Sequence, residues 1–253
     1  MNFNVNSEKF DFEKYRGYPK SCYCVASSPR TGSTLLCEFL TASGNAGRPL
    51  EYFNDQYISD YKERWHFTDL RDYMVLLQRY RTSQNGYFGI KCHADQYLKC
   101  HNLFPKNALF INIYRKDILK QTVSYFKAYI SGQYSFDAEI RKNINKDTYR
   151  FDDMMHVLEV LININNKWEQ VFLSNKNRIK IAYEDLCSDR VSVIKRIEEF
   201  LQIDMKNTYA MTPYLKIQYD DLSQYYLESF TEDLARRNIK ISYDLHTNCF
   251  HMG

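Results

Sequence analysis

Four short apolar runs, each bounded by polar or turn residues, form the framework of the chain. They are residues 21–26, 87–92, 108–114 and 178–183, and helical patterns lie between them. Short apolar runs that alternate with helices are typical of parallel strands buried on both faces. The pattern therefore predicts an α/β fold of three layers, with a mostly parallel central sheet flanked by helices.

Apolar positions that recur with the helical period predict the flanking elements. The first helix is expected to start within residues 32–34 and to stop at Ser43-Gly44. Three further helices are expected at residues 117–129, 151–173 and 189–201. Asp189 has the side chain of an N-cap for the last of them.

Two stretches interrupt this alternation. Residues 54–83 are rich in charged and aromatic side chains, and residues 132–149 are polar and irregular. We expect both to be insertions over the sheet edge, where acceptor-binding lids are often found. No internal repeat, low-complexity tract or linker divides the chain, so we predict a single domain over residues 1–253.

Charge and cysteine content limit the partners and the cellular compartment that we expect. The net charge is +3 with lysine and arginine spread along the chain, which does not favour a nucleic-acid partner. Seven cysteines without regular spacing favour a reducing compartment over a disulfide framework or a zinc site. Residues 1–20 lack the apolar core of a signal peptide, and no run approaches the roughly 18 apolar residues of a membrane span. We expect a cytoplasmic protein without a transmembrane segment.

The first predicted strand leads into the loop SSPRTGST at residues 27–34. Against the Walker pattern G-x-x-x-x-G-K-[ST], Gly32 and Thr34 match, but serine replaces both the first glycine and the lysine. A nucleoside triphosphatase needs that lysine to reach the β- and γ-phosphates. The cation is instead Arg30, inside the loop. Backbone N–H groups and a helix N-terminus remain, so a P-loop-like cradle for a tetrahedral anion is expected.

A second basic site follows the third predicted strand. Arg115 and Lys116 stand at the strand end, and Ser124 lies in the next helix. Arginine presents a planar fork to phosphate oxygens, and a serine hydroxyl adds one donor. Both anion sites lie where a parallel strand ends, so they are expected to face the same crevice.

Glu51 is the candidate general base. The first helix carries the chain about 15 Å away from the strand ends. Residues 44–51, if extended, span up to about 27 Å, enough to return Glu51 to the crevice. A base for an acceptor hydroxyl is needed there. His93, just past the second strand, is a rival base, and a solvated carboxylate or a partner for Arg48 is the plain alternative for Glu51.

These motifs resemble the sulfotransferases that use 3′-phosphoadenosine 5′-phosphosulfate (PAPS). Their loop reads P-[RK]-[ST]-G-[ST]-T, which residues 29–34 match at every place. The run PRTGSTLLCEFL followed by GRPLEYF is similar to the bacterial carbohydrate sulfotransferases, which include lipopolysaccharide sulfotransferase-like proteins.

The resemblance implies transfer of a sulfuryl group from PAPS to a hydroxyl of a carbohydrate or glycolipid. The sulfuryl group carries less negative charge than a phosphoryl group, so no metal is expected to be needed. A homodimer is also implied. Glu51 would be the base, Arg30 would stabilise developing charge, and the acceptor is expected near Lys91, His93 and Arg48. The nucleotide-binding residues implied are Pro29, Arg30, Thr31, Gly32, Ser33, Thr34, Arg115 and Ser124.

Three questions stay open at this level. The family interval from arginine to serine is eight residues, which fits Lys116, whereas Arg115 is nine residues from Ser124 and is our preferred 3′-phosphate ligand. A P-loop-type kinase that uses ATP is one rival function. A non-catalytic nucleotide-binding protein of the same fold is the other.

Overall fold

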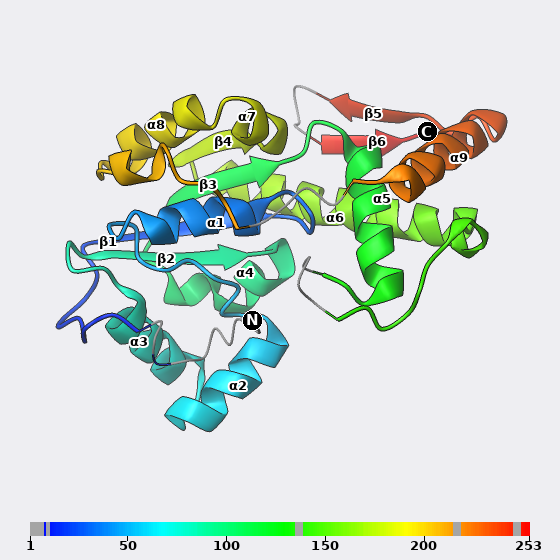
Figure 1. Ribbon diagram of the computed structural model, residues 1–253. Coiled ribbons are helices and arrows are strands. Elements are labelled where there is room, and N and C mark those ends of the chain that lie inside the picture. Colours follow the sequence, from blue (N-terminus) through cyan, green and yellow to red (C-terminus); the bar gives the residue numbers. More distant parts are fainter. Residues whose placement is uncertain (1–7, 9–10, 135–138, 215–218, 245–248) are drawn as a thin grey trace.

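The computed structural model describes residues 8, 11–134, 139–214, 219–244 and 249–253. Its central sheet has four parallel strands in the order β2-β1-β3-β4 (Figure 1). The strands are β1 (Ser21–Ser27), β2 (Tyr87–Cys92), β3 (Leu109–Tyr114) and β4 (Arg178–Ala182). The mostly parallel α/β sheet predicted from the apolar runs is therefore confirmed.

Helices cover the sheet, and a small hairpin follows near the chain end. The helices are α1 (Ser33–Ala42), α2 (Asp55–Trp65), α3 (Leu70–Arg81), α4 (Ala94–Cys100), α5 (Ile118–Ser131), α6 (Phe151–Ser174), α7 (Tyr183–Ser188), α8 (Arg190–Leu201) and α9 (Asp221–Arg236). The hairpin pairs β5 (Ile241–Asp244) with β6 (Cys249–Met252) in antiparallel fashion. Within the part of the chain that the structure describes, no helix is long and apolar enough to cross a membrane.

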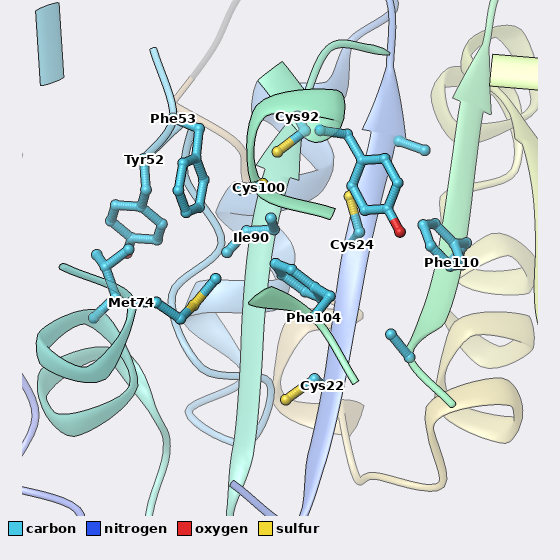
Figure 2. Close-up of a cluster of buried hydrophobic side chains, with 14 of the residues drawn as sticks. Cys22, Cys24, Tyr52, Phe53, Met74, Ile90, Cys92, Cys100, Phe104 and Phe110 are labelled. Atoms are coloured by element: carbon cyan, nitrogen blue, oxygen red, sulfur yellow. The ribbon is translucent and has the colours of Figure 1, made fainter. Parts of the chain in front are cut away.

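Alternation along β1 divides the core into two layers. Tyr23 and Val25 point to the face covered by α1 and α8. Cys22 and Cys24 point to the opposite face, against side chains of α3, α4 and α6 (Figure 2). A strand buried on both faces must be apolar at every position, which explains why β1 reads as a continuous apolar run.

A third apolar cluster joins α5, α6 and α9 beside the sheet. Phe126 of α5 and Tyr226 of α9 pack edge to face, with ring centroids 5.5 Å apart. The N-terminus of α5 is fixed by Asp117, whose side chain accepts from the backbone N–H of Lys120 at 2.9 Å. This packing holds α5 alongside the loop that follows β1 (Figure 1).

The predicted elements agree with the structure with few exceptions. The strand expected at 178–183 ends at Ala182, and Tyr183 is the first residue of α7, with its ring against Gly32 of the β1–α1 loop. Asp189 is the N-cap of α8 as predicted, accepting from the Ser192 N–H at 3.2 Å. Residues 54–83 fold as α2 and α3, and α3 packs against the edge strand β2. Of the other proposed insertion, residues 135–138 lie outside the described chain.

Candidate active site

The loop between β1 and α1 contains two residues with positive φ angles. Arg30 and Gly32 have φ angles of 64° and 75°, in the left-handed region. A Cβ atom on Gly32 would lie 2.2 Å from Cδ2 of Tyr183, closer than any real contact. Glycine is therefore required at position 32 both by the turn and by the ring packed on it.

Side chains inside and outside the loop fix its shape. The Thr31 hydroxyl donates to the carbonyl of Ser28 at 3.0 Å. From α5, the amide nitrogen of Gln121 donates to Ser28 Oγ at 2.9 Å and to the carbonyl of Pro29 at 2.6 Å. Gln121 was not foreseen from the sequence, because its only signal is a polar residue on the face of α5 that carries Ser124.

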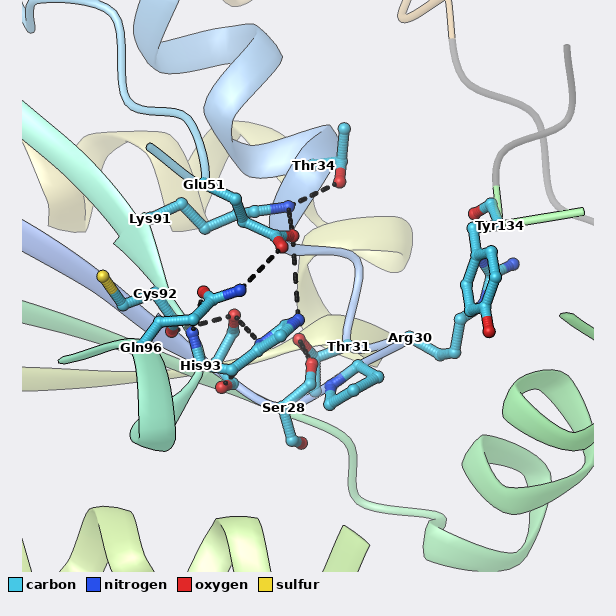
Figure 3. A network of polar contacts seen from close by, with 12 residues as sticks. Ser28, Arg30, Thr31, Thr34, Glu51, Lys91, Cys92, His93, Gln96 and Tyr134 are labelled. Carbon is cyan, nitrogen blue, oxygen red and sulfur yellow. Dashed lines mark hydrogen bonds and ion pairs between the residues drawn. The ribbon is translucent and has the colours of Figure 1, made fainter. Parts of the chain in front are cut away.

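The two predicted anion sites meet at Arg30 and Ser124. Arg30 Nε donates to Ser124 Oγ at 3.0 Å. The Arg30 guanidinium also donates to the backbone carbonyl of Tyr134, which lies beside it (Figure 3). Burial and then the neighbouring Arg115 lower the pKa of Arg30 from its ordinary value. The ends of β1 and β3 therefore present two clustered cations, as an anion-binding crevice requires.

Arg115 and Lys116 have different surroundings. The Arg115 guanidinium lies 4.7 Å from the Tyr183 ring centre, and Arg115 NH1 donates to the Arg30 carbonyl at 3.5 Å. Arg115 Nε is buried without a hydrogen bond, 3.8 Å from a Glu184 oxygen. Lys116 is half exposed and pairs with Asp185 at 2.5 Å. Arg115 therefore lies against the loop that contains Arg30, whereas Lys116 is directed to Asp185 at the exposed surface.

Glu51 lies beside the C-terminal end of β2, as the return path of residues 44–51 predicted. The backbone N–H of Lys91 donates to the carbonyl of Leu50 at 2.9 Å, which anchors the segment to the strand. The Glu51 carboxylate lies 2.6 Å from Lys91 Nζ, 3.2 Å from Gln96 Nε2 and 3.6 Å from His93 Nε2 (Figure 3).

Lys91 also reaches the loop. Its Nζ donates to Thr34 Oγ1 at 3.0 Å, in the first turn of α1. Three separate segments, around residues 34, 51 and 91–93, are thus brought together. The partner of Glu51 is Lys91. The Arg48 guanidinium lies over the Phe12 ring, and the Arg48 backbone bonds with Tyr52 and Arg81.

The surroundings of Glu51 fix its charge. Burial would raise the pKa of this carboxyl, but Lys91 and His93, with hydrogen bonds from Lys91 and Gln96, hold it well below the ordinary value. Burial lowers the pKa of Lys91, and Glu51 more than compensates, so it is raised. Burial lowers the pKa of His93, against the opposing pull of Glu51. The site therefore holds an ionised Glu51–Lys91 pair beside a neutral imidazole at neutral pH.

Comparison with known proteins identifies the family of the chain. The sequence model of the Stf0 sulphotransferase family matches residues 22–86 and 90–233. The chain belongs to this family. Trehalose 2-sulfotransferase of Mycolicibacterium smegmatis is 24% identical, with 87% of this chain and 98% of that protein covered. The enzyme of the same name from Mycobacterium tuberculosis is 22% identical, with 85% and 96% covered.

Solved structures agree on the fold. A sulfotransferase from Alicyclobacillus acidocaldarius superposes with a TM-score of 0.51 at 13% identity, covering 86% of this chain and 94% of that one. The sulfotransferase STF9 from Mycobacterium avium gives 0.52 at 14% identity, covering 87% and 76%. The family and the P-loop-like fold expected from the motifs are confirmed, and the Stf0 chain is a sulfotransferase.

Proposed function

We propose that this sulfotransferase transfers the sulfuryl group of PAPS to a hydroxyl of a carbohydrate or glycolipid. The observation that carries the proposal is the contact between Arg30 Nε and Ser124 Oγ, at 3.0 Å. It brings the loop after β1 and the helix after β3 into direct contact at one cationic site. A nucleotide with two separate phosphate groups needs two such sites side by side.

The residues present fit that donor. In the proposed complex the 5′-phosphosulfate lies on the backbone of residues 29–34 at the start of α1, with the Ser33 and Thr34 hydroxyls. The 3′-phosphate lies against Arg115 and Ser124. Arg115 NH1, 3.5 Å from the Arg30 carbonyl, brings a second guanidinium beside this loop, and its planar fork suits phosphate oxygens.

The acceptor proposal rests on relatives. Both curated relatives are named trehalose 2-sulfotransferase, and each is covered over nearly its whole length. We therefore propose a sugar hydroxyl, with trehalose as the first candidate to test. The six described cysteines are all free thiols, which supports work in the cytoplasm.

In the proposed sulfuryl transfer, Glu51 and Lys91 act on the acceptor hydroxyl and the donor. The acceptor oxygen attacks sulfur and forms the new O–S bond while its O–H bond breaks. The bond from sulfur to the 5′-phosphate oxygen breaks with its electron pair, and 3′-phosphoadenosine 5′-phosphate (PAP) leaves. Glu51 receives the hydroxyl proton, and Lys91, 3.0 Å from Thr34 and 2.6 Å from Glu51, is placed to stabilise charge on the donor side.

Ligand binding separates this proposal from an ATP-dependent kinase. Calorimetry in EDTA is expected to show PAP binding and no response to ATP. A kinase would bind ATP and require Mg²⁺, so ATP binding with Mg²⁺ and none of PAP would overturn the donor assignment.

Catalysis separates it from a non-catalytic nucleotide-binding protein. Replacing Glu51 by Gln removes the proton acceptor and leaves the nucleotide crevice intact. A protein that only binds nucleotide would show no transfer before or after this change. An enzyme would show transfer that Glu51→Gln removes while PAP binding is retained.

A further inference from the structure

His93 has two ring nitrogens in different surroundings. Nδ1 lies 3.1 Å from the carbonyl oxygen of Ser27, at the end of β1, and Nε2 lies 3.6 Å from Glu51 Oε1. The Ser27 carbonyl is held in place by Trp168, whose indole N–H donates to it at 2.8 Å. A carbonyl oxygen only accepts hydrogen bonds, so this contact is a hydrogen bond when the proton is on Nδ1.

The other neutral form of the ring fits less well. With the proton on Nε2, Nδ1 would accept from Ser27 Oγ at 3.3 Å but would also turn a lone pair toward the carbonyl oxygen at 3.1 Å. Ser27 Oγ has another acceptor in the carbonyl of Cys92, at 3.4 Å. Glu51 is also an acceptor, but its nearest oxygen lies 3.6 Å from Nε2, beyond hydrogen-bond distance, whereas the Ser27 carbonyl lies 3.1 Å from Nδ1. The closer contact favours the proton on Nδ1, which leaves the lone pair of Nε2 facing Glu51.

We propose that His93 is the final acceptor of the proton that Glu51 removes from the acceptor hydroxyl. The carboxylate takes the proton from the acceptor hydroxyl and passes it to Nε2 of His93, so the acid formed in the reaction is an imidazolium. This inference rests on the proposed function and deepens it. His93 does not touch the acceptor in this scheme, and it acts through Glu51.

The Lys91 ion pair gives the transfer its direction. A proton kept on Glu51 would break the 2.6 Å pair with Lys91, whereas passing it on restores that pair. The resulting imidazolium donates from Nδ1 to Ser27 and from Nε2 to Glu51, so both N–H groups have acceptors. The gap of 3.6 Å to Glu51 closes with a small rotation or one water, as catalytic hydrogen bonds often do once substrate is bound.

The charges around the ring are consistent with this role. The groups that face it are Glu51 from the segment before α2, Lys91 on β2 and Asp95 on α4. Asp95 is already paired with Lys167 of α6 at 2.6 Å. Burial lowers the pKa of His93 below 6.5, which keeps the ring neutral and ready to accept a proton at neutral pH.

The tautomer can be observed directly. Proton–nitrogen correlation NMR on the full-length protein with PAP bound resolves the ring nitrogens of its six histidines, and His93→Asn assigns the signal of His93. We expect neutral His93 to carry its proton on Nδ1. Acidification should then protonate Nε2, at lower pH still in Glu51→Gln, because Glu51 raises the pKa of His93. A neutral ring protonated on Nε2 would overturn the relay.

Two variants distinguish a proton-relay role of His93 from a purely structural one. In His93→Asn the side-chain amide can take the place of Nδ1 and keep the bond to Ser27, but no acceptor remains at Nε2. His93→Gln loses the Ser27 contact instead. We expect His93→Asn to keep thermal stability and PAP affinity while kcat for sulfation of trehalose, or of the acceptor that a sugar panel identifies, falls about tenfold or more. That loss is smaller than the ~100-fold expected for the base itself.

The pH profile gives a readout that a structural role would not change. In the wild type, kcat should fall as pH drops through the pKa of His93, which burial holds below the ordinary histidine value. His93→Asn should lack this limb. An unchanged limb and kcat would overturn the relay and leave Glu51 as sole base. A fully active Glu51→Gln would instead sink the base assignment in the proposed function.

Discussion

Lys91 Nζ lies between Glu51 Oε1, at 2.6 Å, and Thr34 Oγ1, at 3.0 Å, so one lysine links the candidate base to the donor loop. The pair is well shielded, with exposed side-chain fractions of 8% for Lys91 and 18% for Glu51. Such a pair is costly to break, because the remaining charge is left buried without its partner. Substitution of either Lys91 or Glu51 is therefore expected to have a measurable effect.

Replacing Lys91 by Met should destabilise the protein by about 3 kcal/mol at neutral pH, because Glu51 would remain ionised and unpaired. Lys99 is a matched control, since it pairs with Asp55 at 2.7 Å but with exposed fractions of 47% and 82%. Lys99→Met should cost less than about 1 kcal/mol. Urea unfolding of the two variants measures the difference, and equal losses would show that the Glu51–Lys91 pair contributes no more than a surface pair.

The stability gap between wild type and Lys91→Met should also depend on pH. In the wild type, the lowered pKa of Glu51 contributes stability above its unfolded value of 4.5, lost as pH falls through the folded pKa. In Lys91→Met, burial alone raises that pKa, so ionisation above 4.5 destabilises the variant. The gap should widen as pH rises through about 4.5. A gap that stays constant from acid to neutral pH would contradict the ion pair.

Glu51→Gln should retain PAP binding and lower transfer by at least ~100-fold, the low end for loss of a general base. Glu63→Gln, on the exposed surface of α2, is the control and should leave transfer unchanged. Single-turnover transfer from sulfur-labelled PAPS measures both. Full activity in Glu51→Gln would move the base elsewhere in the crevice.

Arg115→Ala should weaken PAP binding by roughly 10- to 100-fold, because a phosphate oxygen would lose a charge-assisted donor worth about 1.5–3 kcal/mol. Lys116→Ala should leave it nearly unchanged, since Lys116 is half exposed and paired with Asp185. Calorimetric titration with PAP compares them. If Lys116→Ala weakens binding and Arg115→Ala does not, the 3′-phosphate ligand is Lys116.

Gly32→Ala should abolish measurable PAP binding and destabilise the fold, because the new Cβ would lie 2.2 Å from the Tyr183 ring at a φ of 75°. Gly17→Ala separates strain from collision. Gly17 has a φ of 89°, but its Cβ would meet no atom within 4 Å. The strain alone should cost about 1–3 kcal/mol and leave PAP binding intact. Normal PAP binding by Gly32→Ala would show that the loop can rearrange.

The sequence predicted the four-stranded sheet because buried parallel strands are continuous apolar runs with turn residues at their ends. The reach of residues 44–51 also predicted that Glu51 returns to the strand ends, without saying beside which strand it lies. The helices at 94–100 and 221–236 and the hairpin of β5 and β6 were not predicted. They are short or strongly polar segments. They are stabilised by tertiary packing, which involves α5 and α6, and this packing cannot be read from a local pattern.

Side-chain pairing was the least predictable part of the site. The anion-binding residues follow a local motif and could be named from it. The partners of Glu51 could not, because Lys91 and Gln96 are 40 and 45 positions away and reach it only through the parallel pairing of β1 and β2. The same holds for Trp168, whose bond to the Ser27 carbonyl spans 141 positions.

Transfer of labelled sulfur from PAPS, in EDTA, to a panel of trehalose, other disaccharides, glycolipids and cell-envelope extracts is the decisive test of the proposed sulfotransferase activity. We expect one labelled sugar product formed in equal amount to the PAP released, and none when ATP replaces PAPS as the donor. A folded, PAP-binding protein that labels no acceptor in the panel and releases no PAP in its presence would contradict it.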